Sequence, residues 1–163
     1  MLPFFYEVQN PNINNKKRGN IMKFNLFDKS NYFRGLLIVI RKNKTVTESA
    51  SRTVKRIAAV LDFNQDFVDV SLKNLLVNEY IVEEPPKFSD CLIAEIFIKD
   101  AINLALSDGI LSLLQIQWLM NTAQKNNLSK QWVFVEFEDF INSYISNLEM
   151  PFEIQKRKYK VVN

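Results

Sequence analysis

Six basic side chains lie close together in the first half of the chain: Arg41, Lys42, Lys44, Arg52, Lys55 and Arg56. Glu48 is the one acidic residue among them. Arg52, Lys55 and Arg56 are spaced at i, i+3 and i+4, so a helix would place them on one face. Such a local excess of positive charge can bind an acidic protein surface, a phosphate-bearing ligand or an anionic lipid surface. The alternative interpretation is a solvated helix face without a partner.

The positive charge is local rather than global. Residues 22–155 contain 14 Lys and Arg against 17 Asp and Glu, although the whole chain carries a net charge of +3. Because the domain lacks both a strongly basic balance and a recognition-helix motif, we do not expect it to bind nucleic acid. We expect a protein partner, with an anionic ligand or an anionic lipid surface as the alternative.

The chain contains no histidine, and this excludes large classes of sites. Ser-His-Asp and Cys-His catalysis and nearly all catalytic zinc centres need that residue. Glycine-rich phosphate loops and nucleophile elbows are also missing from the sequence. Adjacent carboxylates occur at Glu83/Glu84 and Glu138/Asp139. The side chains of Glu138 and Asp139 diverge because adjacent residues on a helix point in different directions. Glu83 and Glu84 precede two prolines, and we expect them to be solvated. We therefore expect neither an enzyme nor a cofactor.

The elements that position these side chains are predicted to be helices, because the chain has only 3 Gly and 5 Pro and its apolar residues recur at helical spacing. The helices are expected over 31–41, 47–61, 65–78, 89–107, 112–126 and 129–148. The residues expected to cap four of their N-termini are Thr47, Asn64, Ser112 and Ser129. The third helix is expected to direct five side chains inward, namely Phe67, Val68, Leu72, Leu75 and Leu76. The predicted fold class is all-α, a single helical domain of about six to seven helices.

The helix expected over 89–107 is apolar on most sides, which is typical of a helix at the centre of a fold. Cys91 lies in this run, and we expect it to be a small buried hydrophobic residue rather than a reactive thiol. As the single cysteine of the chain, it cannot form an intramolecular disulfide. No apolar stretch reaches the ~18 residues of a membrane span, so a cytoplasmic location is expected.

The chain resembles itself when it is shifted by 65 residues. Residues 32–76 align with residues 97–141 without a gap, and their apolar positions and helix caps coincide. Thr47, for example, aligns with Ser112. A register held over this length predicts two pseudo-repeated three-helix units.

The folded domain is expected over residues 22–150, with unit one at about 31–80 and unit two at about 89–148. The leader, residues 1–21, is expected to be disordered, or to be a mis-annotated start with translation beginning just after it. The basic C-terminal tail, residues 151–163, is expected to be disordered or to form a short extended arm.

Two segments resemble the tellurite-resistance protein B (TerB)-like domain family. They are Ser-Asp-Gly-Ile-Leu-Ser at residues 107–112 and Tyr-Ile-Val-Glu-Glu-Pro-Pro at residues 80–86, between the units. The resemblance covers about residues 31–147. It implies an all-helical fold of two pseudo-repeated units in a prokaryotic cytoplasm. It also implies a stress-response protein that binds metal or acts as an interaction module.

The family's metal ligands are mostly replaced in this chain. TerB-like domains place acidic residues around the first turn of each unit and near the start of the next helix. Unit two keeps only Asp108, and unit one has Asn43 and Lys44 where Asp and Gly would stand. Since Ca²⁺ or Mg²⁺ needs several converging oxygen ligands, we expect no metal site. A divalent-metal site at Asp108 is the alternative.

Phe134 stands where unit one has the charged Asp69. Most aromatic residues of this last helix are expected in the core. Phe134 is therefore the candidate exposed contact for a protein partner or a homodimer. The function expected from the sequence is a non-enzymatic cytoplasmic interaction module with a basic face on unit one. The alternative is a divalent-metal-binding protein of the tellurite-resistance type.

Overall fold

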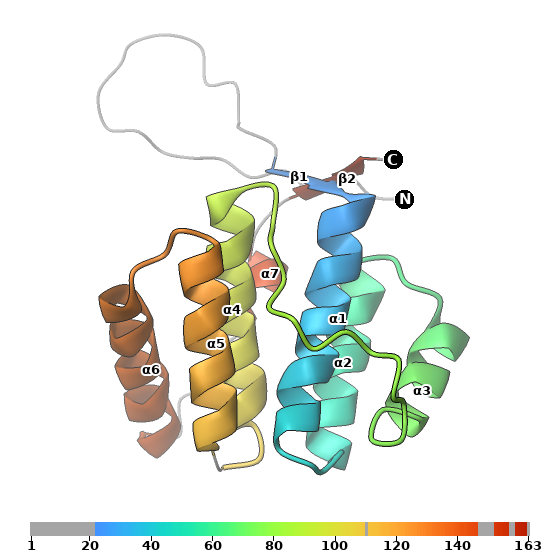
Figure 1. Ribbon diagram of the computed structural model, residues 1–163, viewed down its shortest axis with the longest axis horizontal. Coiled ribbons are helices and arrows are strands. Elements are labelled where there is room, and N and C mark those ends of the chain that lie inside the picture. Colours follow the sequence, from blue (N-terminus) through green and yellow to red (C-terminus); the bar gives the residue numbers. More distant parts are fainter. Residues whose placement is uncertain (1–21, 110, 147–151, 157–158, 163) are drawn as a thin grey trace, which may run out of the picture.

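The computed structural model describes residues 22–109, 111–146, 152–156 and 159–162. Within these ranges the chain forms seven helices: α1 (Leu26–Lys42), α2 (Glu48–Val60), α3 (Gln65–Lys73), α4 (Cys91–Leu106), α5 (Leu113–Lys125), α6 (Lys130–Ile145) and the short α7 (Glu153–Lys156). The one sheet has two parallel strands, β1 (Met22–Asn25) and β2 (Tyr159–Val162). The predicted all-α single domain is confirmed (Figure 1). None of the described helices has the length and apolar character to cross a membrane.

The four predicted N-caps are confirmed by their hydrogen bonds. The side chains of Thr47, Asn64, Ser112 and Ser129 each accept a hydrogen bond from the backbone N–H three residues later. Ser112 also forms a capping box with Gln115, whose side chain accepts from the Ser112 N–H. Four helix starts are therefore fixed by short-range contacts. The helices follow the order of the two predicted units, and the duplication itself stays a prediction.

Helix α1 begins earlier than the predicted start at Asn31. It starts at Leu26, where the side chain of Asn25 accepts a hydrogen bond of 2.7 Å from the Asp28 N–H. The buried carboxylate of Asp28 in turn accepts hydrogen bonds from the N–H and the hydroxyl of Ser89. The extra turn is thus stabilised by a residue far away in sequence, which helical spacing alone does not reveal.

Helix α3 ends earlier than the predicted end at residue 78. Its last residue is Lys73, and a series of turns follows. Arg41 donates hydrogen bonds to the carbonyl oxygens of Leu75 and Asn78, so this backbone is bound by a side chain of α1 instead of continuing a helix. Leu76, expected in the core, is consequently 47 % exposed.

The predicted inward face of α3 is otherwise only partly correct. Val68, Leu72 and Leu75 are buried as expected. Phe67, however, is 53 % exposed, and its ring is stacked on Phe63 and tilted against Phe33. A short helix covers less of the core than the long one predicted, so its first aromatic residue stays at the rim.

Helix α4 is central, as predicted, and contacts α1, α2, α5, α6 and α7. Its crossing with α1 is close because Gly35 lies against the buried ring of Phe97. A β-carbon at position 35 would lie 2.5 Å from Cζ of that ring. The ring of Phe97 also meets Tyr32 edge to face, with the centroids 5.2 Å apart. Glycine at this position is therefore required by packing.

Cys91 corrects another expectation from the sequence. It is the first residue of α4 and is exposed, not buried. The partial burial of the thiol and the nearby carboxylates of Glu95 and Asp90 raise its pKa. Cys91 lies at the exposed start of the helix, and the apolar run that contains it is buried only from Ile93 onward.

The segment that follows α6 returns to the domain. Phe152 and Ile154 are buried in the common core, and β2 runs alongside β1 in parallel register, with Met22 opposite Tyr159. Figure 1 shows this small sheet at one end of the helical layer. The described part of the predicted tail is thus packed on the domain.

Candidate anion-binding site

The site lies at the C-terminal end of α1, where two cations occupy the last helical turn. Arg41 and Lys42 lie next to the final carbonyl groups of the helix, a position that the helix dipole favours for positive charge. Asn43 caps the helix, and Lys44 has a positive φ of 57° that turns the chain toward α2. Lys44 therefore lies exposed beside the two preceding cations.

A pocket of about 350 Å³ opens beside these three cations. Its lining residues come from four parts of the chain and are Arg41, Lys42, Lys44, Leu76, Glu83 and Leu114. Leu76 belongs to the turns after α3, Glu83 to the linker between the units, and Leu114 to the first turn of α5. We call this the basic pocket. It forms only when residues from both halves of the domain come together.

Glu83 is the only acid among the lining residues of the basic pocket. Its Oε1 lies 3.0 Å from Nε of Arg41, and its Oε2 lies 2.5 Å from Nζ of Lys42. The expectation that Glu83 is solvated is correct only in part, because its side chain is 41 % exposed but paired with two cations. One carboxylate faces three cations, and Lys44 has no carboxylate partner among the described residues. The pocket keeps an excess of positive charge.

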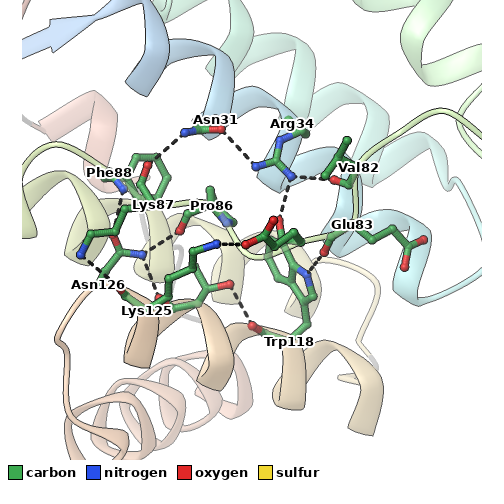
Figure 2. A network of polar contacts seen from close by, with 12 residues as sticks. Asn31, Arg34, Val82, Glu83, Pro86, Lys87, Phe88, Trp118, Lys125 and Asn126 are labelled. Atoms are coloured by element: carbon green, nitrogen blue, oxygen red, sulfur yellow. Dashed lines mark hydrogen bonds and ion pairs between the residues drawn. The ribbon is translucent and has the colours of Figure 1, made fainter.

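The linker that carries Glu83 is held in place by side chains of α1 and α5 (Figure 2). Arg34 donates hydrogen bonds to the carbonyl oxygens of Val82 and Glu84, at 2.6 and 2.8 Å. The indole N–H of Trp118 donates to the carbonyl oxygen of Glu83 at 2.7 Å. These bonds fix the backbone on either side of the Glu83 carboxylate.

Glu84 is solvent-exposed, as expected, with its side chain 69 % exposed. Its carboxylate forms an ion pair with Lys125, and the hydrogen bond from that ammonium group lowers the pKa of Glu84. Glu84 thus joins the linker to the end of α5. The adjacent carboxylates point to different partners, as expected for residues that do not act as an acid–base pair.

Asn126 closes the other end of the linker. Its side-chain amide donates to the carbonyl oxygen of Pro86 at 2.8 Å, and its Oδ1 accepts from the N–H of Phe88 at 2.9 Å (Figure 2). Asn31 of α1 adds a hydrogen bond to the carbonyl oxygen of Lys87. The linker is consequently a structural strap, and Glu83 occupies a defined position in the basic pocket.

The remaining predicted cations lie elsewhere on α2. Lys55 forms an ion pair of 2.7 Å with Asp69 and so joins α2 to α3. Arg52 lies 3.4 Å from Glu48 in an i, i+4 pair, and both side chains are mostly exposed. Neither residue lines the basic pocket.

Arg56 faces yet another neighbour. Its guanidinium lies 5.9 Å from the centroid of the Phe152 ring, on the side of α2 that packs against the C-terminal segment. The six predicted cations therefore do not form one surface. Three line the basic pocket, and three have separate intramolecular contacts.

Asp108, the alternative metal ligand, has a structural contact. Its Oδ1 accepts a hydrogen bond of 2.5 Å from the hydroxyl of Thr47, which joins the turn before α5 to the start of α2. The described residues contain no group of three or more Cys, Asp or Glu side chains placed to hold a metal ion. A single carboxylate bound to a hydroxyl offers few of the oxygen ligands that Ca²⁺ needs.

Phe134, the candidate apolar contact, is 60 % exposed on α6. Its neighbours Val133, Phe137 and Phe140 are buried in the core. The side chain is thus accessible, and its contact with a protein partner or a second copy stays a prediction.

Three residues of the basic pocket were not predicted, namely Leu76, Glu83 and Leu114. The two leucines at positions 113 and 114 directly follow a helix cap and are exposed, and this pattern could have drawn attention to them. Glu83 lies in a linker without helical spacing, so no local signal places it beside Arg41.

Comparison of the chain with protein-family models, curated proteins and solved structures finds no match. The resemblance to TerB-like domains therefore stays a prediction, and the function must be argued from the geometry of the site.

Proposed function

We propose that the chain is a non-enzymatic cytoplasmic interaction module of the TerB-like type, whose basic pocket binds an anionic group of a protein partner. The observation that carries this proposal is the concave site that Arg41, Lys42 and Lys44 line together with a single carboxylate. Unlike charges on a flat helix face, these cations share one cavity with apolar walls.

The partial burial of two of the cations strengthens the expected attraction. The side chains of Arg41 and Lys42 are 22 % and 23 % exposed, so they lie in a medium less polarisable than bulk water. Charge pairs are stronger in such surroundings than on an open surface. Glu83 occupies only part of the donor capacity of Lys42, because an ammonium group has three donors, whereas Arg41 also donates to the carbonyl oxygens of Leu75 and Asn78.

A bound carboxylate would complete this arrangement through Lys42 and Lys44. Each ammonium can donate to the same oxygen atoms, and the apolar walls of Leu76 and Leu114 would exclude water from one side. The interpretation as a solvated face fits Arg52 better, because it is mostly exposed and has only an i, i+4 partner.

The test uses a short fluorescent oligo-aspartate peptide as probe and NMR to map its contacts on the whole chain. We expect binding at low ionic strength that weakens steeply with added salt, because exposed charges are screened. The largest shifts should occur at Lys42, Lys44 and Leu114. Lys44→Glu should weaken binding at least about tenfold, since it reverses one of three charges.

Lys130→Glu is the matched control. Lys130 is exposed at the start of α6 and does not line the basic pocket. The variant changes the net charge of the chain by the same amount as Lys44→Glu but should keep the affinity within about twofold. Equal weakening by both variants, or no binding of oligo-aspartate at low salt, would overturn the proposal.

A further inference from the structure

A second, more apolar pocket adjoins the basic pocket. It has a volume of about 450 Å³ and is lined by Val46, Ser51, Leu72, Lys73, Leu76 and Val77. We call it the apolar pocket. Leu76 lines both pockets and forms their common wall. The two cavities are thus two parts of one surface at the ends of α1 and α3.

The early end of α3 opens this surface. After Lys73 the chain makes turns instead of a further helical turn, with the N–H of Val77 bonded to the carbonyl oxygen of Asn74. Val77 is 77 % exposed and Leu76 47 % exposed as a result. Arg41 binds the carbonyl oxygens of Leu75 and Asn78, so the turns that present these apolar side chains are held firmly.

The charges around the joined pockets select the chemistry of an occupant. The lining residues contribute four cations, Arg41, Lys42, Lys44 and Lys73, and one acid, Glu83. A basic segment would be repelled there. A free phosphate would satisfy the cations but leave the exposed side chains of Leu76 and Val77 in contact with water. A ligand that combines negative charge with an apolar group of side-chain size fits both pockets.

We infer that the occupant is an acidic peptide segment of a partner protein in which a bulky apolar residue stands next to carboxylates. The apolar side chain enters the apolar pocket beside Leu72 and Val77, and the carboxylates bind Lys42 and Lys44 on the other side of Leu76. The inference rests on the proposed function and adds the identity of the partner segment to it. An anionic membrane is the competing occupant, but a bilayer surface presents a layer of headgroups and does not place a single apolar side chain in the apolar pocket.

The experiment compares two peptides on the whole chain, Asp-Asp-Leu-Asp-Asp and Asp-Asp-Ala-Asp-Asp. The leucine peptide should bind at least about tenfold more tightly, which is the gain expected from burying one leucine side chain. Val77→Ser should reduce this ratio to below about threefold. Val70→Ser is the matched control, because Val70 is 57 % exposed on α3 and lies outside both pockets. It should leave the ratio unchanged.

The outcomes separate the two proposals. Equal binding of both peptides by the unmodified chain would overturn the acidic–apolar segment while leaving anion binding intact. Failure of both peptides and of oligo-aspartate would overturn the proposed function as well. Vesicles of phosphatidylserine and phosphatidylcholine form the last arm. Strong binding to them without binding to either peptide would overturn the inference in favour of a membrane.

Discussion

The hydroxyl of Tyr32 donates a hydrogen bond of 2.6 Å to Oδ2 of Asp100, and both residues are buried. The carboxylate also accepts from the backbone N–H groups of Glu153, at 2.5 Å, and Ile154, at 3.2 Å. Asp100 of α4 therefore joins α1 to the first turn of α7. This buried acid adds polar contacts to the apolar packing of Phe152 and Ile154 that attaches the C-terminal segment.

The stability of the protein should fall with pH through the titration of Asp100. Burial raises the pKa of this group from 3.8 to about 7, although its hydrogen bonds favour the charged form. The native state thus keeps a proton that the unfolded chain releases, so the stabilisation is complete below pH 3.8 and is lost as the pH rises to about 7. The loss amounts to at most about 4 kcal/mol.

Asp100→Asn checks this dependence, because asparagine does not titrate. The free energy of unfolding of both proteins is measured by urea denaturation from about pH 4 to about pH 8. As the pH rises, the free energy of unfolding of Asp100→Asn should increase relative to that of the unmodified protein. A difference that stays constant over this range would contradict the prediction.

Tyr32→Phe should raise the pKa of Asp100 further. The hydroxyl of Tyr32 stabilises the charged carboxylate and so lowers its pKa, and the variant lacks that donor. We also expect a loss of about 1–2 kcal/mol in stability at neutral pH. NMR titration of the Asp100 carboxyl carbon measures the first effect. Tyr144→Phe, at an exposed residue of α6, should change neither quantity and serves as the control.

Gly35→Ala should destabilise the protein by about 1–3 kcal/mol, even though alanine is the better helix former. The new methyl group would lie 2.5 Å from Cζ of Phe97, a ring that is fully buried and cannot move away. Thermal and urea denaturation measure the loss. In a protein that also carries Phe97→Leu, Gly35→Ala should reduce the stability much less. If the stability losses of the two substitutions simply add in the double variant, the clash between the methyl group and the ring is not their cause.

Asn126→Ala should cost about 2–3 kcal/mol, because it leaves buried backbone groups of the linker without partners. Asn126 is 3 % exposed and bonds to Pro86, Phe88 and Thr122. Asn121→Ala, at an exposed position of α5, should change the stability by less than about 0.5 kcal/mol. If both variants change the free energy of unfolding equally in urea denaturation, the hydrogen bonds of Asn126 to the linker do not stabilise the protein.

Glu83→Gln should strengthen the binding of oligo-aspartate about three- to tenfold. The substitution keeps the size of the side chain but removes the carboxylate that now lies beside Arg41 and Lys42. Fluorescence titration at low ionic strength measures the gain. If the affinity falls instead, Glu83 would be needed to hold the two cations in a binding arrangement.

The sequence predicted the positions of most helices because their determinants are local. Thr47, Asn64, Ser112 and Ser129 bond to backbone three residues away, so their effect is visible in a short window. The two wrong helix ends both involve distant partners. Asp28 binds Ser89, and Arg41 binds the carbonyl oxygens of Leu75 and Asn78.

The candidate site was also predicted only in part, because its local features are visible in the sequence and its contacts with distant residues are not. Counting charges along the chain located Arg41, Lys42 and Lys44. The count could not separate them from Arg52, because the separation depends on where Glu83 and the linker lie in space.

The sequence by itself thus determined an all-α domain, four helix starts and a local excess of positive charge, since each follows from residue type and short-range spacing. Only the tertiary structure decided which cations are neutralised and which surround a cavity. Ion pairs such as Lys55–Asp69 and Arg41–Glu83 join separate elements, and burial changes charge strength only after the chain has folded. The exposed apolar pocket beside the cations has the same origin, because it exists only where α3 stops short of its predicted end.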